Sequence, residues 1–396
     1  MGKKVTIVGA GNAGQTHAFH LTTKGHEICL YEHPDFTKAL DAIKQNGNKI
    51  EALAEFKKGD LTIKSAINGT AQIAKVTTDI KEAMDWSDII IMPVPAFAQV
   101  NVFKQMMPHL RDGHLLTILP GNDASLIFAK LLREAGIKKD VVFCEGASIP
   151  YACRIVGPAQ IFIGGMKDAF EFGVFPANRT ADAAKRMKEI LPLELDIKQN
   201  VIEVHFNNLN VIAHPATATL NMGAFESRGG EFYFYKEGMS ESVSKVQQKI
   251  DDERLAIGAK FGFKLQSFLE LIKLWYHIDA KTIHEFSQVT PIHNAFGHDA
   301  PKSAKERYIA EDTPFILVPF HEFGELAGVP HPAIRSIIDI DNIYNDTDYF
   351  ANGRTLAVMG LAGMSIKDIL QYAETGELKL SKTAGKTIQP GRELRP

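Results

Sequence analysis

The stretch that decides the fold begins at the fifth residue and reads Val5-Thr6-Ile7-Val8-Gly9-Ala10-Gly11-Asn12-Ala13-Gly14. Its first four residues are apolar or β-branched and predict a short buried strand, and a helical pattern follows over residues 15–24. In the intervening G-x-G-x-x-G, Gly9 allows a tight turn, Gly11 lets backbone N–H groups approach a pyrophosphate, and Gly14 lets the helix pack closely. The helix N-terminus also favours negative charge. The motif therefore predicts a dinucleotide site that includes Asn12 and Ala13.

The residue that ends the next strand bears on which dinucleotide binds. The strand is expected over residues 26–31, and Glu32 follows it, 18 residues after Gly14. A carboxylate in this place accepts hydrogen bonds from ribose hydroxyls and repels a 2′-phosphate, so Glu32 favours NAD. His33 and Lys38 stand nearby and leave NADP open. The alternative is an ordinary βαβ unit with a solvated glutamate.

The composition is that of a soluble globular protein. With 396 residues the chain is long enough for two domains, and its net charge of −3 indicates neither nucleic acid nor an anionic membrane as a partner. The cysteines Cys29, Cys144 and Cys153 form no disulfide framework and no C-x-x-C pair, which suits a reducing cytosol. The hydrophobic run 89–98 contains two prolines and is too short for a membrane span. We expect a cytoplasmic protein.

The first half of the chain alternates strands and helices. Strands are expected over 75–78, 89–92, 115–119, 141–144, 161–164 and 171–175, and helices over 36–45, 80–85, 100–110, 124–135 and 180–191. Asp79 is the expected N-cap of the helix 80–85, and residues 49–56 and 61–65 are expected to form an inserted hairpin. This pattern predicts an α/β Rossmann-type, doubly wound domain over residues 1–197.

The second half changes to helical spacing. Helices are expected over 200–221, 241–261, 267–276, 315–327, 332–344 and 365–375, and few strand patterns remain. We therefore predict a mostly α-helical substrate domain over residues 198–396, with a mobile end from 383 onward.

A proline-rich loop follows the strand 89–92 and reads Pro93-Val94-Pro95-Ala96-Phe97-Ala98. Ligands of open α/β sheets bind beyond the carboxyl ends of the strands, and the prolines stiffen this loop. We expect Pro95, Ala96 and Phe97 to contact a ring of the cofactor. The alternative is a turn that only introduces the next helix.

His214 is the candidate acid or base. It stands in an apolar run directly before Pro215, so a kink is expected there, and a histidine in such a setting suits proton transfer near neutral pH. The alternative is a core histidine bonded to a backbone carbonyl. Asp312 is a candidate to hold the imidazole in one tautomer, and Arg307 to clamp a substrate carboxylate. Alternatively, Glu311 and Asp312 only start the helix that follows.

Two further kinds of site are not expected. His293, His298, His321 and His331 stand in no compact ligand spacing, so we predict no metal. No nucleophile elbow accompanies Ser148 or Cys153. Arg154, by contrast, is expected on a loop at the ligand side of the sheet, because it follows the strand 141–144.

Taken together, these motifs resemble the octopine/nopaline (opine) dehydrogenase family. The resemblance spans most of the chain and rests on Gly9–Gly14, Val94-Pro95-Ala96-Phe97-Ala98, Pro150-Tyr151-Ala152-Cys153-Arg154, His214-Pro215, Arg307-Tyr308-Ile309-Ala310-Glu311-Asp312, Ala327-Gly328-Val329-Pro330 and Asp348-Tyr349 with Gly353-Arg354-Thr355-Leu356.

The resemblance implies a fold and a reaction. The second domain is expected to be like the C-terminal domain of 6-phosphogluconate dehydrogenase, with substrates in the cleft between the domains. An α-keto acid, pyruvate by expectation, and an amino acid form an imine that NAD(P)H reduces. His214 is then the acid/base, Asp312 its support, and Arg307, Cys153 and Arg154 bind substrate. A homodimer is compatible with this assignment.

Two other functions stay open. A simple 2-keto acid or ketopantoate-like reductase shares the two-domain plan and needs no amine. A dinucleotide-sensing protein needs no turnover, although His214, Arg307 and Asp312 argue against it.

Overall fold

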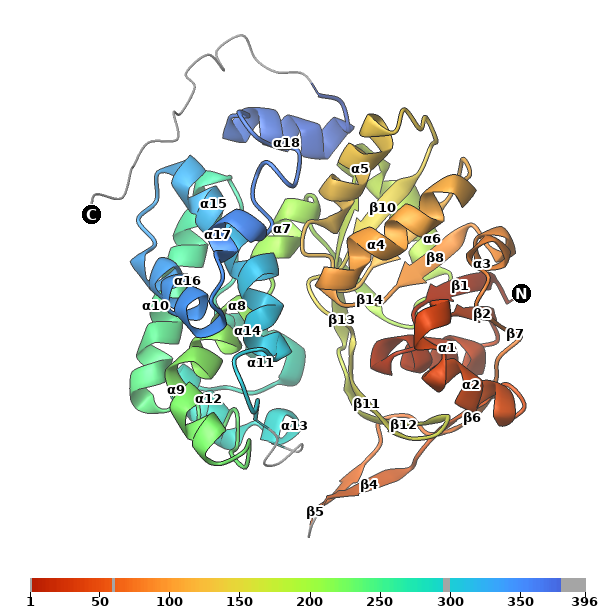
Figure 1. Cartoon of the computed structure of the whole chain (residues 1–396), viewed down its shortest axis with the longest axis horizontal. Helices are drawn as coiled ribbons and strands as arrows, with labels where there is room; N and C mark the ends of the chain where they lie inside the picture. The colour runs from red at the N-terminus through yellow and green to blue at the C-terminus, as the bar shows by residue number, and fades with distance from the viewer. Residues whose placement is uncertain (1, 59–60, 295–299, 379–396) are drawn as a thin grey trace.

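The computed structural model describes residues 2–58, 61–294 and 300–378, and Figure 1 shows a sheet-containing part beside a helical part. The larger sheet has the order β14-β13-β10-β9-β8-β1-β2-β7. Its strands are β1 (Lys4–Val8), β2 (Glu27–Tyr31), β7 (Lys75–Thr77), β8 (Ile89–Met92), β9 (Leu115–Ile118), β10 (Val142–Glu145), β13 (Ala169–Phe175) and β14 (Glu194–Ile197). All neighbours are parallel except β10 and β13. The predicted Rossmann-type domain is confirmed.

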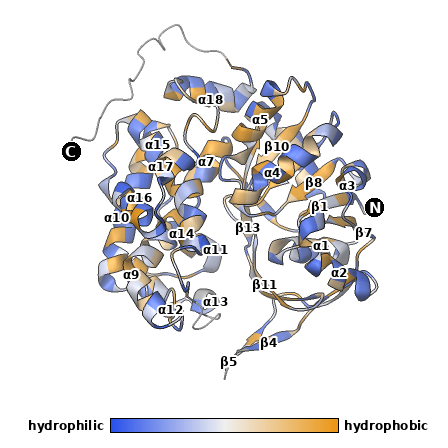
Figure 2. Cartoon of the chain, viewed as in Figure 1, coloured by the Kyte–Doolittle hydropathy of each residue, from blue (hydrophilic) through white to orange (hydrophobic). Residues whose placement is uncertain are grey.

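The central strands are buried along their whole length. Every residue of β8, β9 and β10 is buried, as continuous apolar runs predict for parallel strands covered on both faces. Figure 2 shows the same hydrophobic character along β8. The chain moves from β1 outward to β2 and β7 and then returns to β8 on the other side of β1. The loops after β1 and β8 therefore meet at the switch point of the sheet, where ligands bind.

A second sheet corrects two details of the sequence analysis. It has the order β11-β12-β3-β6, formed by β3 (Lys49–Ala52), β6 (Gly69–Gln72), β11 (Tyr151–Gly157) and β12 (Gln160–Met166). The expected strand 49–56 is therefore split, and only β4 (Glu55–Lys58) pairs with β5 (Leu61–Lys64) as a hairpin. Arg154 stands on β11 and not on a loop, because residues 151–157 pair with β12.

The helices of the first part lie close to their expected places. They are α1 (Asn12–Thr23), α2 (Lys38–Gln45), α3 (Ile80–Trp86), α4 (Ala96–Met106), α5 (Ala124–Glu134) and α6 (Thr180–Lys188), with short 3₁₀ turns over Pro34–Phe36, Met107–His109 and Ala177–Arg179. Asp79 caps α3 as expected, since its carboxylate accepts from the N–H groups of Lys81 and Glu82. Helix α4 begins four residues before the expected position 100, directly after Pro95.

The helical part contains α7 (Val201–Phe206), α8 (Asn210–Ala213), α9 (Pro215–Ser227), α10 (Glu241–Lys260), α11 (Phe268–Tyr276), α12 (Ile283–Val289), α13 (Pro291–Asn294), α14 (Arg307–Ala310), the π-helical turn η4 (Thr313–Leu317), α15 (Val318–Ala327), α16 (Pro332–Asn345), α17 (Tyr349–Asn352) and α18 (Ile366–Thr375). The helix expected over 200–221 is three helices. The break at His214 was predicted, because Pro215 donates no N–H and starts α9. The second break, at residues 207–209 between α7 and α8, was not predicted.

The end of the described chain returns to the sheet-containing part. Helix α18 lies beside α5 in Figure 1, and the ring of Tyr372 meets that of Phe175 at 5.1 Å between centroids. The mobile segment expected from residue 383 lies outside the described residues. Within the described ranges, no helix is long and apolar enough to cross a membrane.

Candidate active site

The turn between β1 and α1 has the geometry that a pyrophosphate requires. Gly9 has φ +110°, and a Cβ on Gly14 would lie 1.8 Å from the carbonyl oxygen of Gly9, so both positions demand glycine. A Cβ on Gly11 would meet nothing within 4 Å, which leaves open space over the turn. No side chain caps α1 and its first turn holds no acidic residue. The backbone N–H groups at this end therefore fit a phosphate.

Glu32 lies at the same turn. Its Oε2 accepts from the N–H of Ala10 at 2.7 Å, and its Oε1 accepts from the N–H of His33 at 2.9 Å. The carboxylate is thereby fixed beside the glycine turn, where a ribose is expected. Both oxygens keep lone pairs for hydroxyl donors.

The loop after β8 borders the turn after β1. A Cβ on Gly9 would lie 2.7 Å from Cγ1 of Val94, so the two loops touch. Pro95 precedes α4, Ala96 is buried, and the ring of Phe97 is 57% exposed at the start of the helix. Asn12 faces the second sheet, because its Oδ1 accepts from the N–H of Ile155 at 2.7 Å.

His214 and Asp312 are brought together by the fold. The Nδ1 of His214 lies 2.8 Å from Oδ2 of Asp312, and its Nε2 lies 3.1 Å from the hydroxyl of Tyr235. Tyr308 packs edge-on against the imidazole, with 4.7 Å between the ring centroids. The alternative of a histidine bonded to a backbone carbonyl does not describe this site, since both ring nitrogens meet side chains.

The surroundings of the imidazole indicate its tautomer. Burial raises the pKa of Tyr235 well above 10, so its hydroxyl keeps its proton and can donate to Nε2. Nδ1 then carries the hydrogen and donates to Asp312. Burial raises the pKa of Asp312, while the hydrogen bond from His214 acts in the opposite direction. Asp312 does not cap the following turn η4 with its side chain. Its carboxylate orients His214 instead.

Glu311 connects the helical part to the proline-rich loop after β8, a contact that the sequence analysis did not predict. Its Oε2 accepts from Nε of Arg307 at 2.5 Å, and its Oε1 accepts from the N–H of Ala96 at 2.7 Å. The side chain of Arg307 is 68% exposed, so it presents a cation at this junction. The bond to Ala96 also explains why α4 begins early.

Cys153 and Arg154 take different places on β11. The thiol of Cys153 is buried and donates to the carbonyl oxygen of Asn12 at 3.5 Å, at the start of α1. Burial raises its pKa, so it stays a thiol. Arg154 is exposed, and its guanidinium donates to the carbonyl oxygen of Cys153 at 3.3 Å.

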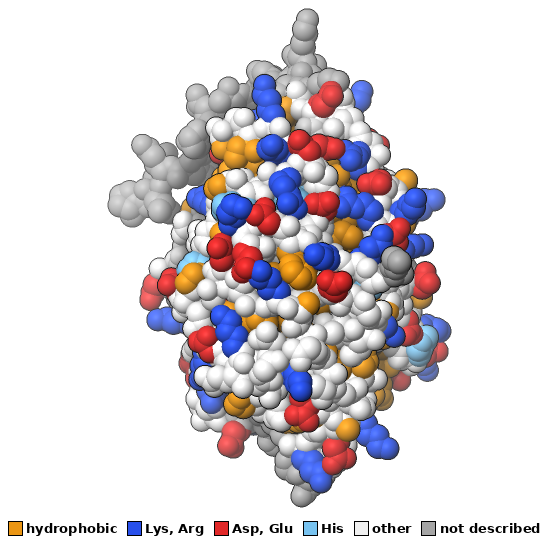
Figure 3. Space-filling view, turned by 90° about the vertical axis from the view of Figure 1, so that its right-hand side faces the viewer, with side chains coloured by type: hydrophobic (Ala, Val, Ile, Leu, Met, Phe, Trp, Pro, Cys, Tyr) orange, Lys and Arg blue, Asp and Glu red, His pale blue; other side chains and the backbone are white. Residues whose placement is uncertain are grey.

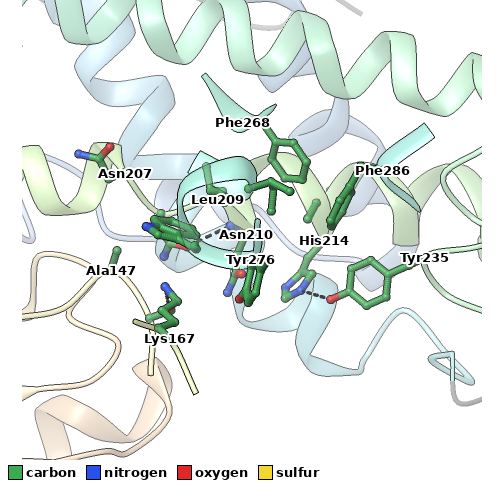
Figure 4. Close-up of a pocket in the computed structure, with 15 residues that line it drawn as sticks. Ala147, Lys167, Asn207, Leu209, Asn210, His214, Tyr235, Phe268, Tyr276 and Phe286 are labelled. Carbon is green, nitrogen blue, oxygen red and sulfur yellow. Dashed lines mark hydrogen bonds between the residues drawn. The ribbon is translucent and has the colours of Figure 1, made fainter. Parts of the chain in front are cut away.

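A pocket beside His214 holds residues that sequence analysis missed (Figure 4). Lys167 follows β12, and its ammonium donates to Oγ of Ser148 at 2.9 Å and lies 3.9 Å from the ring centre of Trp275. Nζ is also 3.3 Å from Oε2 of the buried Glu171. Six other residues that line the pocket are apolar or aromatic, namely Leu209, Phe268, Ile272, Trp275, Tyr276 and Phe286. Nothing local in the sequence marks these residues, because they come from separate elements.

Comparison with known proteins decides the family. Residues 197–345 match the family described as NAD/NADP octopine/nopaline dehydrogenase, alpha-helical domain, and residues 4–150 match the NAD-dependent glycerol-3-phosphate dehydrogenase N-terminus. The opine dehydrogenase of Arthrobacter sp. (strain 1C) is 30% identical over 375 residues, which cover 94% of this chain and 99% of that protein. The chain belongs to the opine dehydrogenase family.

Two more relatives agree with this family. Vitopine synthase of Allorhizobium ampelinum is 27% identical over 91% of this chain and 96% of its own length. A structure of octopine dehydrogenase with NADH and L-arginine shares the fold with a TM-score of 0.69 at 18% identity, covering 94% of this chain and 98% of that one. The chain is thus an NAD(P)-dependent oxidoreductase, and the predicted NAD(P)H-dependent reductive condensation is confirmed.

Figure 3 shows the side chains on one face of the outer surface. Basic and acidic side chains are interspersed there over the described residues, in agreement with the net charge of −3.

Proposed function

We propose that this chain joins an α-keto acid, with pyruvate as the expected substrate, to the amino group of an apolar amino acid. The observation that carries the proposal is the pocket in which the His214–Asp312 pair faces an aromatic wall. The nicotinamide cofactor supplies the hydride that reduces the imine. The division into residues 1–197 and 198–396 belongs to the same proposal, and the end of β14 at Ile197 supports it.

His214 is the base that prepares the amine. An amino acid arrives as an ammonium ion, and its nitrogen attacks the keto carbon only after it has lost a proton. Nε2 of His214 carries the lone pair for that proton, and the substrate nitrogen takes the place held by the Tyr235 hydroxyl. Asp312 stabilises the imidazolium that forms, since its carboxylate stays bonded to Nδ1.

Arginine side chains suit the substrate carboxylates. Nε of Arg307 donates to Glu311, and the two terminal nitrogens of the guanidinium are left for a substrate carboxylate. Arg154 on β11 is the second candidate for a substrate carboxylate, and it belongs to the sheet-containing part of the molecule. Cys153 on β11 stays a predicted substrate-binding residue. Its thiol is buried against the start of α1, so its effect on the substrate would be indirect.

The pocket wall indicates the class of amine donor. A guanidinium or ammonium side chain needs carboxylates, and none of the described residues that line the pocket is acidic. Lys167 places a positive charge there, and Glu171 behind it is already paired with that charge. Leucine-, methionine- or phenylalanine-like side chains fit the aromatic wall better.

Glu32 supports NADH as the preferred cofactor, because its fixed carboxylate favours ribose hydroxyls over a 2′-phosphate. We also propose a cytoplasmic location, which the three unpaired cysteines support. A homodimer remains part of the proposal, to be tested by light scattering.

The test is NADH oxidation, followed by absorbance, with pyruvate alone and with pyruvate plus a panel of amino acids. We expect turnover only when both substrates are present, with kcat/KM at least tenfold higher for leucine, methionine or phenylalanine than for arginine or lysine. Turnover with pyruvate alone would assign a simple keto acid reductase. NADH binding without turnover over the whole panel would assign a dinucleotide sensor.

A variant sharpens the donor test. In Lys167→Met the buried Glu171 loses its cationic partner, so we expect kcat/KM for arginine to rise relative to that for leucine. The KM for NADH is the control and should not change, because Lys167 lies in the pocket beside His214 and not at the glycine turn. If the ratio of kcat/KM for arginine to kcat/KM for leucine is unchanged, Lys167 does not select the amine donor.

A further inference from the structure

Two histidines and a glutamate lie together on α15 and at the start of α16, away from the active-site pocket. His321 and Glu325 are four residues apart on α15 and share one face of the helix. Gly328, with φ +63°, ends that helix, and the chain turns back so that His331 precedes α16. One nitrogen or oxygen from each of the three side chains lies within 4.8 Å of the others.

The approach of His331 to α15 depends on a glycine. A Cβ on Gly324 would lie 2.6 Å from Nδ1 of His331, so no larger residue at 324 allows this ring position. The imidazole therefore rests directly on the backbone of α15, between His321 and Glu325.

The hydrogen bond of His331 to the backbone aims its other ring nitrogen at His321 and Glu325. Nδ1 of His331 lies 2.7 Å from the carbonyl oxygen of Val329, which only accepts, so Nδ1 carries the hydrogen. Nε2 of His331 therefore accepts a hydrogen bond from Nδ1–H of His321 at 2.8 Å and lies 3.6 Å from Oε1 of Glu325. A metal ion would take the place of that shared hydrogen, with the hydrogen of His321 moved to its Nε2, so that both facing nitrogens offer lone pairs. A carbonyl that fixes the far nitrogen of a ligand histidine is the usual second contact of a metal site.

We propose that His321, Glu325 and His331 form a binding site for a divalent metal ion of the Zn²⁺ type. Two imidazole nitrogens and one carboxylate are donors that zinc accepts, whereas Mg²⁺ and Ca²⁺ prefer oxygen alone. Zinc–ligand distances of about 2.0–2.2 Å separate tetrahedral ligand atoms by about 3.3–3.5 Å. The two nitrogens have to part by about half an ångström, and the side chain of Glu325, 63% exposed, is free to close on the ion. Water completes the coordination.

The charge state of the cluster suits a cation. Glu325 contributes negative charge, and so does Asp339 on α16. Arg335 is the cation that faces the cluster, and it is paired with Asp339 at 3.7 Å. A bound ion would tie α15 to the start of α16 across the turn at Gly328.

The experiment is a zinc titration of the full-length protein after removal of metal with EDTA. We expect one ion per chain with a dissociation constant below about 10 µM, and a rise in Tm of about 2–5 °C at a hundredfold excess over that constant. Co²⁺ bound in its place should give the visible absorption of a tetrahedral site. NADH oxidation is recorded separately, since it reports on the other site.

Variants decide whether these residues are the ligands. Glu325→Gln changes an exposed side chain, so it should fold normally and weaken zinc binding about tenfold or more, and His331→Gln should abolish it. His277→Gln, an exposed histidine paired with Asp168, is the matched control and should bind as the wild type does. If zinc binds more weakly than about 100 µM, or if Glu325→Gln binds with unchanged affinity, the site is overturned.

Discussion

At the scale of single residues, the imidazole of His214 has both nitrogens engaged before any substrate arrives. Asp312 holds Nδ1 and Tyr235 holds Nε2, and the second of these bonds is the one that a substrate nitrogen can replace. The neutral hydroxyl of Tyr235 is a weaker partner for Nε2 than an ammonium ion, because charged hydrogen bonds are stronger. In the absence of substrate the imidazole of His214, the proposed base, is thus oriented without being blocked.

His214→Ala removes the proposed base. We expect turnover to fall by about 10²–10⁴-fold or more, because general acid–base groups contribute this much, while NADH still binds. Stopped-flow turnover and the quenching or enhancement of NADH fluorescence measure the two effects. His277→Ala is the control, since that histidine is 78% exposed. Turnover at the wild-type rate in His214→Ala would exclude His214 from the mechanism.

The glycines of the first turn have different roles that two variants separate. Gly11→Ala adds a methyl group where nothing lies within 4 Å, at a φ of −73° that alanine accepts. We expect an unchanged Tm and NADH binding that is at least tenfold weaker, because the methyl group enters the space over the turn. Gly14→Ala places its Cβ 1.8 Å from the Gly9 oxygen and should destabilise the fold itself by about 1–3 kcal/mol. Equal effects of both variants on Tm would contradict this distinction.

At the scale of elements, the helices around Asp312 are joined by a buried carboxylate. Asp341 on α16 accepts from the hydroxyl of Thr219 on α9 at 2.7 Å and from that of Thr313 on η4 at 2.6 Å. Burial raises its pKa to about 7, although the hydrogen bonds from the two hydroxyl groups act in the opposite direction. This junction holds the π-helical turn directly after Asp312 in place.

The stability of this junction should depend on pH. The folded chain keeps the Asp341 proton up to about pH 7, whereas the unfolded chain loses it near 3.8, so its stabilisation is complete below 3.8 and is lost as pH rises to 7. Asp341→Asn removes this titration. Between pH 5 and pH 8 the free energy of unfolding should fall by about 2–3 kcal/mol more in the wild type than in the variant. Urea unfolding at both pH values measures this difference, and parallel pH profiles would contradict it.

The helices and strands also show which features of the fold could be predicted from the sequence. Continuous apolar runs, the glycine turn and the Asp79 cap are local signals, and the strands and helices they predicted are present. The position of α4 and the second sheet depend on partners far away in the chain, such as Glu311 for Ala96 and β12 for β3. The motif at His214 and Asp312 predicted the pair, whereas Tyr235 and Lys167 carry no local pattern. Only the tertiary fold brings them to the pocket.

At the scale of the whole molecule, the two parts are held together by buried charge. Arg354 follows α17 and reaches into the sheet-containing part, where its guanidinium donates to the carbonyl oxygens of Gly121, Asn122 and Ala96 and to Oε1 of Gln99 at 2.6 Å. Burial lowers the pKa of Arg354 to about 10, and the buried acids Glu145 and Asp123 act in the opposite direction. This contact holds α4 in place relative to α8 and α9, the two helices that meet at His214. The first residues of α4 border the glycine turn after β1.

Arg354→Met tests this connection. Removing one member of a buried charged network leaves the carbonyl oxygens and the acidic groups without their cation, so we expect a loss of about 3–5 kcal/mol in the free energy of unfolding. NADH binding should weaken as well, because the start of α4 loses the guanidinium that bonds to Ala96. Arg228→Met is the control, since its pair with Glu237 is exposed and should contribute less than about 1 kcal/mol. Urea unfolding and NADH fluorescence measure both effects. If the two variants lose equal stability, Arg354 does not hold the parts together, and Glu311 at the N–H of Ala96 becomes the main link between them.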